Sequence, residues 1–241
     1  MRYAIFSDIH SNLEALNAVL KDLQDQNIDA YFCCGDIVGY GADPSRCINR
    51  IREIGAISVA GNHDWAVCGK SQHMRLNALA RESILWTASV ISKEERDFLL
   101  GLELVFRNND FVLVHGTLHA PEAFHYLLSF FHVQRTLSLL DEPVCFIGHS
   151  HIQEIFVQKE NKIDHLKTYS FHLEPDCKYL VNVGSVGQPR DRDPNAAYCV
   201  YDTETKMIDL KRVSYDIKKT QNKIMAVNLP KALASRLLLG I

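Results

Sequence analysis

Residues 2–26, "RYAIFSDIHSNLEALNAVLKDLQDQ", hold a strand signal, a polar loop and a helix signal in that order. Residues 2–8, "RYAIFSD", are a short β-favouring run that ends in polar residues. Leucines then recur at helical spacing over residues 13–23. Ser11 and Glu14 match the S-x-x-E capping box that begins many helices. The stretch therefore predicts a strand, a loop and a capped helix.

The same unit repeats along the next part of the chain. Residues 29–36, "DAYFCCGD", are a second apolar run, followed by the Gly-rich turn "GYGADP" and a helical pattern over 45–55. Residues 56–64, "AISVAGNHD", predict a third strand that again ends in polar residues. Near-continuous apolar strands that alternate with helices indicate a parallel sheet covered on both faces, hence an α/β fold.

The remaining residues predict further elements of both kinds. Residues 75–100 carry two helical patterns, the second capped by Ser92 and Glu95. Buried strands are predicted in "FVLVHG" and "VCFIGHS", each ending in a polar loop. Shorter, more charged strands after residue 152 favour antiparallel pairing, and two helices broken at Pro230 end the sequence. No linker or repeat divides the chain, so residues 1–241 are predicted to form one domain.

Composition and charge narrow the class of protein. The sequence has 241 residues, of which 47% are hydrophobic and 23% are charged, and a chain of this size buries roughly 70–75% of its unfolded surface. A net charge of −3 without a Lys/Arg run argues against nucleic acid as a partner, except as a small nucleotide substrate. Seven cysteines without CxxC spacing indicate reduced, structural thiols. No signal-peptide or membrane-span pattern is present, which favours a cytoplasmic protein without membrane contact.

Metal-ligating side chains follow one predicted strand after another. They are Asp8 and His10, Asp36, Asn62 with His63 and Asp64, His115, and His149 with His151. In an open α/β sheet, loops at the carboxyl ends of strands converge on one crevice. Taken singly, such residues are usually caps, turns or core groups, but independent explanations for the whole set are improbable.

The residue types predict two transition-metal ions. Oxygen and imidazole ligands without thiolate suit Mn, Fe, Zn, Co or Ni, and the donors are too many for one tetrahedral ion. Two ions that share a bridging carboxylate are the usual arrangement for in-line attack on phosphorus, with a water acidified to hydroxide as the nucleophile. The sequence alone leaves the native metal pair open.

The ordered blocks D-x-H, G-D, G-N-H-D, H and G-H-x-H span residues 8–151 and resemble the signature of the calcineurin-like metallophosphoesterases. Residues 182–198, "NVGSVGQPRDRDPNAAY", are similar to a segment of small prokaryotic phosphodiesterase-like members. The resemblance implies a four-layer α/β/β/α sandwich with mixed central sheets. It also implies a dinuclear-metal-dependent phosphoesterase that acts, through metal-activated hydroxide, on phosphodiesters in a small phosphorylated substrate.

The resemblance also implies a role for each residue of the blocks. One ion would be held by Asp8, His10 and His151, the other by Asn62, His115 and His149, with Asp36 bridging them. His63 would face the substrate as a catalytic residue, oriented by Asp64. In an extended strand His149 and His151 would face the same way and suit one ion, so the resemblance requires the chain to bend between them.

Departures from the family pattern concern the substrate. The arginines that Ser/Thr phosphatases of this superfamily carry after the second block and before the third are missing. Arg190 and Arg192 are candidates to replace one of them, although both could be solvated loop charges. Tyr40, between two glycines, is a candidate for base stacking or for facing phosphate.

Several features fit no motif and leave alternatives open. The histidines at 73, 119, 125, 132, 165 and 172 are predicted to be structural or surface residues, with His119 retained as a candidate for the substrate pocket. The Phe-rich segment 124–133 could form a substrate lid, a core element or a subunit contact. The alternative functions are a phosphoprotein phosphatase, a dinucleoside polyphosphate hydrolase and a non-catalytic metal-binding scaffold, while a nuclease would call for a basic extension. Oligomeric state is not predicted.

Overall fold

The computed structural model describes residues 1–70, 77–127 and 129–241. Its helices are α1 (Leu13–Asp22), α2 (Pro44–Glu53), α3 (Asn62–Val67), α4 (Ala78–Val90), α5 (Lys93–Leu100), α6 (Phe130–Ser138), α7 (Ile217–Ala226) and α8 (Lys231–Ser235), with the 3-10 turns η1 (Pro121–Ala123) and η2 (Arg236–Leu238). Within these residues, no helix has the length and apolar character needed to span a membrane.

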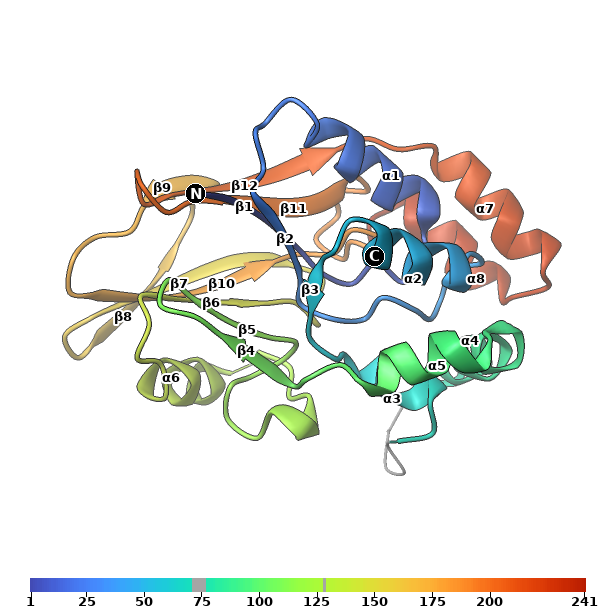
Figure 1. The fold of residues 1–241 in the computed structure, drawn as a ribbon, viewed down its shortest axis with the longest axis horizontal. Helices are drawn as coiled ribbons and strands as arrows, with labels where there is room; N and C mark the ends of the chain where they lie inside the picture. The colour runs from blue at the N-terminus through green and yellow to red at the C-terminus, as the bar shows by residue number, and fades with distance from the viewer. Residues whose placement is uncertain (71–76, 128) are drawn as a thin grey trace.

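The strands form two six-stranded sheets. They are β1 (Arg2–Phe6), β2 (Ala30–Cys33), β3 (Ile57–Ser58), β4 (Val105–Arg107), β5 (Val112–Val114), β6 (Val144–Ile147), β7 (Gln153–Lys159), β8 (Lys162–Leu166), β9 (Ser170–His172), β10 (Cys177–Val183), β11 (Ala196–Asp202) and β12 (Met207–Val213). The first sheet has the order β3-β2-β1-β11-β12-β9 and the second β4-β5-β6-β10-β7-β8. Helices α1, α2 and α7 lie beside the first sheet and α6 beside the second (Figure 1).

Strand β1 contributes to two hydrophobic cores. Tyr3 and Ile5 belong to the core between the sheets, whereas Ala4 and Phe6 belong to the core beneath α1 and α2. This follows from the alternation of side chains across a strand, which lets a continuous apolar run bury both faces. The four-layer arrangement with mixed central sheets is therefore confirmed.

The parallel strands do not share one sheet. The first sheet pairs β1, β2 and β3 in parallel, and the second pairs β5, β6 and β10 in parallel. Antiparallel strands extend both, including β7 with β8 and β11 with β12. The antiparallel second half is confirmed apart from β10, which is antiparallel to β7 but parallel to β6. The apolar pattern of a strand indicates that both of its faces are buried, but it does not indicate to which of the two sheets the strand belongs.

The predicted cap of the first helix is wrong by one residue. Asn12, not Ser11, is the N-cap of α1, and its Oδ1 accepts the Ala15 N–H at 3.2 Å. Glu14 instead pairs with Lys223 of α7, with a Nζ–Oε1 distance of 2.7 Å. The Ser92–Glu95 capping box of α5 is confirmed, as is the break at Pro230 between α7 and α8.

Candidate metal centre

The loops that carry the candidate ligands share an unusual backbone. Five of the ligand residues have positive φ, namely Asp8 (53°), His10 (49°), Asp36 (53°), His149 (67°) and His151 (63°). Non-glycine residues rarely adopt this left-handed conformation, and such strain is typical of functional sites. Gly148 allows the close approach, because a Cβ there would lie 2.0 Å from Ser7 Oγ.

One cluster joins Asp8, His10 and His151, all buried. The Nε2 atoms of the two histidines are 3.0 Å apart, and His151 Nε2 lies 3.1 Å from Asp8 Oδ1. Each histidine donates its Nδ1–H to a backbone carbonyl, His10 to Val38 at 3.1 Å and His151 to Gln188 at 2.5 Å. Both rings are thereby oriented with a bare Nε2 toward the centre of the cluster.

A second cluster joins Asn62, His115 and His149. His115 Nε2 lies 3.0 Å from His149 Nδ1 and 3.1 Å from Asn62 Oδ1. His115 donates its Nδ1–H to the Cys34 carbonyl at 2.8 Å, which turns its Nε2 toward the second cluster. His149 and His151 thus lie in different clusters, and the chain bends between them.

Asp36 lies between the two clusters. Its Oδ2 is 3.3 Å from His115 Nε2 and 3.6 Å from His10 Nε2, while its Oδ1 accepts the His63 backbone N–H at 2.8 Å. A single carboxylate thus faces a histidine of each cluster, as a bridging ligand would.

The described residues fit a pair of metal ions. In the first cluster two bare imidazole nitrogens lie 3.0 Å apart, and they repel each other unless a cation lies between their lone pairs. In the second cluster His115 Nε2 and His149 Nδ1 are equally close, a spacing at which both nitrogens could bind one ion. In addition, Asp8 Oδ1 and His149 Nε2 are buried without a hydrogen-bond partner among the described residues. Buried polar atoms of this kind call for a ligand.

The electrostatics of the clusters favour the same reading. Burial, together with neighbouring positive charge, lowers the pKa of His149 to about 3 and that of His151 to about 4, so both imidazoles are neutral near pH 7. Burial also acts against the charged form of His115, but the Asp36 carboxylate outweighs it and raises the pKa of His115 to about 9. Positive charge is therefore favoured beside Asp36, whether a proton or a metal ion supplies it.

His63 and Asp64 lie at the centre, but the expected contact between the Asp64 carboxylate and the His63 imidazole is not formed. The His63 ring packs 4.7 Å from that of His10 and 4.5 Å from that of Tyr40 between centroids. Asp64 instead accepts four backbone N–H groups, those of residues 36, 37, 38 and 61. Within the described residues no hydrogen bond joins Asp64 to the His63 ring, and His63 Nδ1 has no partner. Asp64 therefore ties two ligand loops together instead of orienting the imidazole.

The structure separates the three candidates for substrate binding. Arg190 Nη2 donates to the Tyr40 hydroxyl at 3.3 Å, beside the first cluster. Arg192 is exposed, and its backbone N–H donates to the Gly240 carbonyl. Tyr40 is only 5% exposed, with its ring against those of His10 and His63. The Tyr40 ring is therefore covered by its neighbours, and base stacking stays an untested candidate role.

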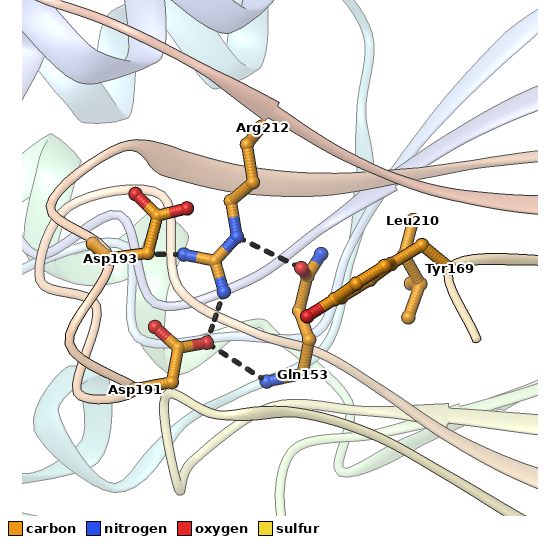
Figure 2. A pocket seen from close by; sticks show the side chains of 6 residues that line it. All are labelled: Gln153, Tyr169, Asp191, Asp193, Leu210 and Arg212. Carbon is orange, nitrogen blue, oxygen red and sulfur yellow. Dashed lines mark hydrogen bonds and ion pairs between the residues drawn. The ribbon is translucent and has the colours of Figure 1, made fainter. Parts of the chain in front are cut away.

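A hydrogen-bond network around Arg212 holds the loop that carries Arg190. Arg212 forms an ion pair with Asp191 and donates to Gln153 Oε1 at 2.9 Å, and Figure 2 shows this network from close by. Arg212 also donates to the carbonyl of Asn195 at 3.1 Å. The network borders a cavity of about 430 Å³ lined by Gln153, Tyr169, Asp191, Asp193, Leu210 and Arg212. It joins β7, β12 and the loop that carries Arg190.

The Phe-rich segment 124–133 divides between two environments. Phe124 is buried against Trp65, and Tyr126 stacks on His149 with centroids 3.8 Å apart. Phe130 and Phe131, on α6, are 59% and 58% exposed. Sequence reasoning missed Tyr126, and no spacing pattern could have linked it to a histidine 23 positions later.

The other described histidines belong to neither cluster. His125 stacks on His132, and His165 stacks on Phe156. His119 is half-buried, and His172 is exposed on β9. His73 lies outside the described residues.

Comparisons with known proteins agree with this geometry. A family model described as the calcineurin-like phosphoesterase superfamily domain matches residues 1–206. An uncharacterized protein from Methanocaldococcus jannaschii is 43% identical over 241 residues, covering 98% of this chain and 97% of the relative.

Solved structures share the fold along the whole chain. A metallophosphoesterase from Sphaerobacter thermophilus superimposes with a TM-score of 0.87 at 33% identity, covering 100% of this chain and 99% of the other. A hypothetical protein from Pyrococcus horikoshii has a TM-score of 0.81 at 19% identity, covering 100% and 98%, and shows the fold alone. With the matched family model, these likenesses establish that the chain belongs to the calcineurin-like phosphoesterase superfamily.

Proposed function

We propose that the chain is a metal-dependent phosphodiesterase that acts on a small phosphorylated substrate. The observation that carries the proposal is the pair of buried clusters that both face the Asp36 carboxylate. Two ions held side by side are suited to in-line displacement at phosphorus.

Each cluster would hold one divalent transition-metal ion. The proposed ligands are Asp8, His10 and His151 for one ion, Asn62, His115 and His149 for the other, and Asp36 for both. When bound, the ions supply Lewis acidity toward phosphoryl oxygens and lower the pKa of water. Imidazole and carboxylate ligands accept Mn, Fe, Zn, Ni or Co, and metal supply would decide among them.

His63 and Arg190 would act on the substrate. The His63 imidazole has an unpartnered Nδ1 and lies beside His10, where it can stabilise charge on the phosphoryl group or donate a proton to the leaving oxygen. Arg190 donates to the Tyr40 hydroxyl, and the Tyr40 ring packs against that of His63. Arg190 would bind non-bridging oxygens, because guanidinium groups match phosphate geometry. Tyr40 would position Arg190 without itself contacting a base.

A diester is favoured over a monoester by charge. A diester phosphate carries one negative charge and a monoester approaches two near neutral pH, so a monoesterase needs more positive charge around the phosphoryl oxygens. The arginines that phosphoprotein phosphatases carry in two of the blocks are replaced here by "GDIVGYG" and "VAGNHD". A phosphoprotein phosphatase is therefore the less favoured alternative.

The test is turnover of bis-p-nitrophenyl phosphate and p-nitrophenyl phosphate by the manganese-loaded protein, with metal content measured in the same sample. We expect about two ions per chain and a higher kcat/KM for the diester. A higher kcat/KM for the monoester would reject the diester preference.

Loss of turnover on both substrates by a metal-loaded protein would favour the non-catalytic scaffold. All seven proposed ligands and His63 are present in this chain, whereas scaffold members of this fold are expected to lack some of them.

A further inference from the structure

The C-terminal segment places a second guanidinium beside the metal centre. Arg236 begins η2, beyond residue 206, where the family-model match ends. Its Cζ lies 4.5 Å from the centroid of the Tyr40 ring, and its Nη2 donates to Gln188 Oε1 at 2.6 Å. Tyr40 packs on His10, and the Gln188 carbonyl accepts from His151. Arg236 is thus one residue removed from the first cluster by two separate routes.

Arg190 converges on the same two neighbours. Its Nη2 donates to Gln188 Oε1 at 3.1 Å and to the Tyr40 hydroxyl at 3.3 Å. Neither guanidinium forms an ion pair with a carboxylate of the described residues, and Arg236 Nε is buried without a partner there. Two like charges on one neutral amide oxygen repel each other, and an anion between them would remove that repulsion.

Packing holds Arg236 in this place. Leu233 and Leu237, on either side of it, are buried in a cluster that also contains Tyr40. The backbone N–H of Arg192 donates to the Gly240 carbonyl at 2.8 Å, which attaches the end of the chain to the loop that carries Arg190. The guanidinium is therefore presented by packed elements that reach both sides of the site.

The two arginines lie at different depths. Arg190 adjoins the first cluster directly, because its backbone N–H donates to the His151 carbonyl at 3.1 Å. Arg236 is linked to the centre through Tyr40 and Gln188, and its own pKa is lowered by burial and by Arg190. Arg190 is thus the neighbour of the reacting group, and Arg236 lies further out.

We propose that Arg236 and Arg190 form an anion subsite that binds a second phosphate group next to the scissile one. This rests on the proposed metal-dependent hydrolysis of disubstituted phosphates. It narrows the substrate class to those in which one substituent of the scissile phosphate is a second phosphate joined through oxygen, that is, phosphoanhydrides. Guanidinium groups suit this role because their planar donors match phosphate oxygens. Arg190 contacts both phosphates, and Arg236 contacts the outer one.

The experiment measures how inorganic pyrophosphate and orthophosphate inhibit hydrolysis of bis-p-nitrophenyl phosphate, with manganese in excess of total phosphate. In the wild type, pyrophosphate is expected to have the lower Ki. Arg236→Met should raise the Ki of pyrophosphate about ten- to hundredfold, the range of a hydrogen bond to a charged group, and raise that of orthophosphate far less. Arg236→Lys, which keeps the charge but loses the fork, should be intermediate.

Lys231→Met is the matched control, because it removes a positive charge from an exposed position of α8 in the same segment. It should leave both Ki values unchanged. Equal increases for the two anions in Arg236→Met, or no increase for either, would overturn the subsite.

The two proposals fail separately. If the metal-loaded wild type does not hydrolyse the diester, the proposed function fails, and calorimetric titration with pyrophosphate still decides the subsite. Tighter binding by the wild type than by Arg236→Met would support it, and equal affinity would reject it.

Discussion

At the scale of single residues, His63 is a buried histidine of the site that is not among the proposed metal ligands. Its Nδ1 has no hydrogen-bond partner among the described residues. His63→Ala should keep both ions, because no proposed ligand changes, and should lower kcat about 10²- to 10⁴-fold, the usual contribution of a proton-transfer group. Metal analysis and diester kinetics on one sample measure both effects. His172→Ala, at an exposed position of β9, is the control, and full activity of His63→Ala would reject the assigned role.

Gly39 supports the same imidazole, although sequence reasoning did not single it out. Its φ is +90°, and a Cβ there would lie 2.3 Å from His63 Nδ1. Gly39→Ala should therefore displace the His63 ring and lower both kcat and the melting temperature.

Gly55→Ala separates the clash from the backbone strain. Gly55 also has a positive φ (+62°), but a Cβ there would meet nothing within 4 Å. The Gly55→Ala variant should lose roughly 1 kcal/mol of stability through backbone strain and keep the kcat of the wild type. Equal kcat values for the two variants would show that Gly39 does not shape the site.

At the scale of elements, a group of charges attaches α7 to α1 and α2. Lys223 pairs with Glu14 of α1 at 2.7 Å and with Asp43, the N-cap of α2, at 2.6 Å. Burial alone would raise the pKa of Glu14, but hydrogen bonds from Lys223 and Lys219 outweigh burial and lower it below its ordinary value of 4.5. A lowered pKa in the folded state stabilises the fold above pH 4.5, and this contribution is lost as the pH falls through the lowered pKa.

Glu14→Gln should reduce the free energy of unfolding at pH 7 by about 1–3 kcal/mol, because it removes a charged partner from a mostly buried group. Denaturant unfolding of the variant and the wild type should converge as the pH falls below 4.5 and through the lowered pKa of Glu14. The matched control is Glu174→Gln, whose ion pair with Lys159 is exposed on both sides and should contribute little to stability. A pH-independent difference between Glu14→Gln and the wild type would contradict the electrostatic explanation.

At the scale of the whole molecule, the candidate centre joins the two sheets. Asp8, Asp36 and Asn62 follow strands of the first sheet, whereas His115 and His149 follow strands of the second. Ions bound between them would stabilise only the folded chain. Manganese at 100–1,000 times its Kd should therefore add about 2.7–4.1 kcal/mol for each ion bound, and a chelator should lower the melting temperature correspondingly.

Asp36→Asn tests whether that stabilisation comes from this centre. Loss of the carboxylate that faces both clusters should remove most of the metal-dependent rise in melting temperature, while His172→Ala should retain it. An unchanged rise in Asp36→Asn would place the stabilising ions elsewhere.

Much of this protein could be predicted from local chemistry. Strand and helix periodicity gave the α/β class, and polar residues after successive strands identified the group that meets at one edge, because strand ends in such folds converge. The expected separation of His149 from His151 came from the family resemblance, since alternation in a strand would have placed them together. Positive φ at both residues is the physical reason for the bend.

Contacts between distant segments required the tertiary structure. Asp64 accepts hydrogen bonds from four backbone N–H groups of neighbouring loops. Asn12, not Ser11, caps the first helix. The sequence by itself determined which side chains could bind metal, because the donor atoms are set by residue type and their place after each strand is set by residue order. Only the folded chain decided that Tyr40 is covered and that Arg236, 196 positions later, lies over it, because such contacts depend on how whole elements pack.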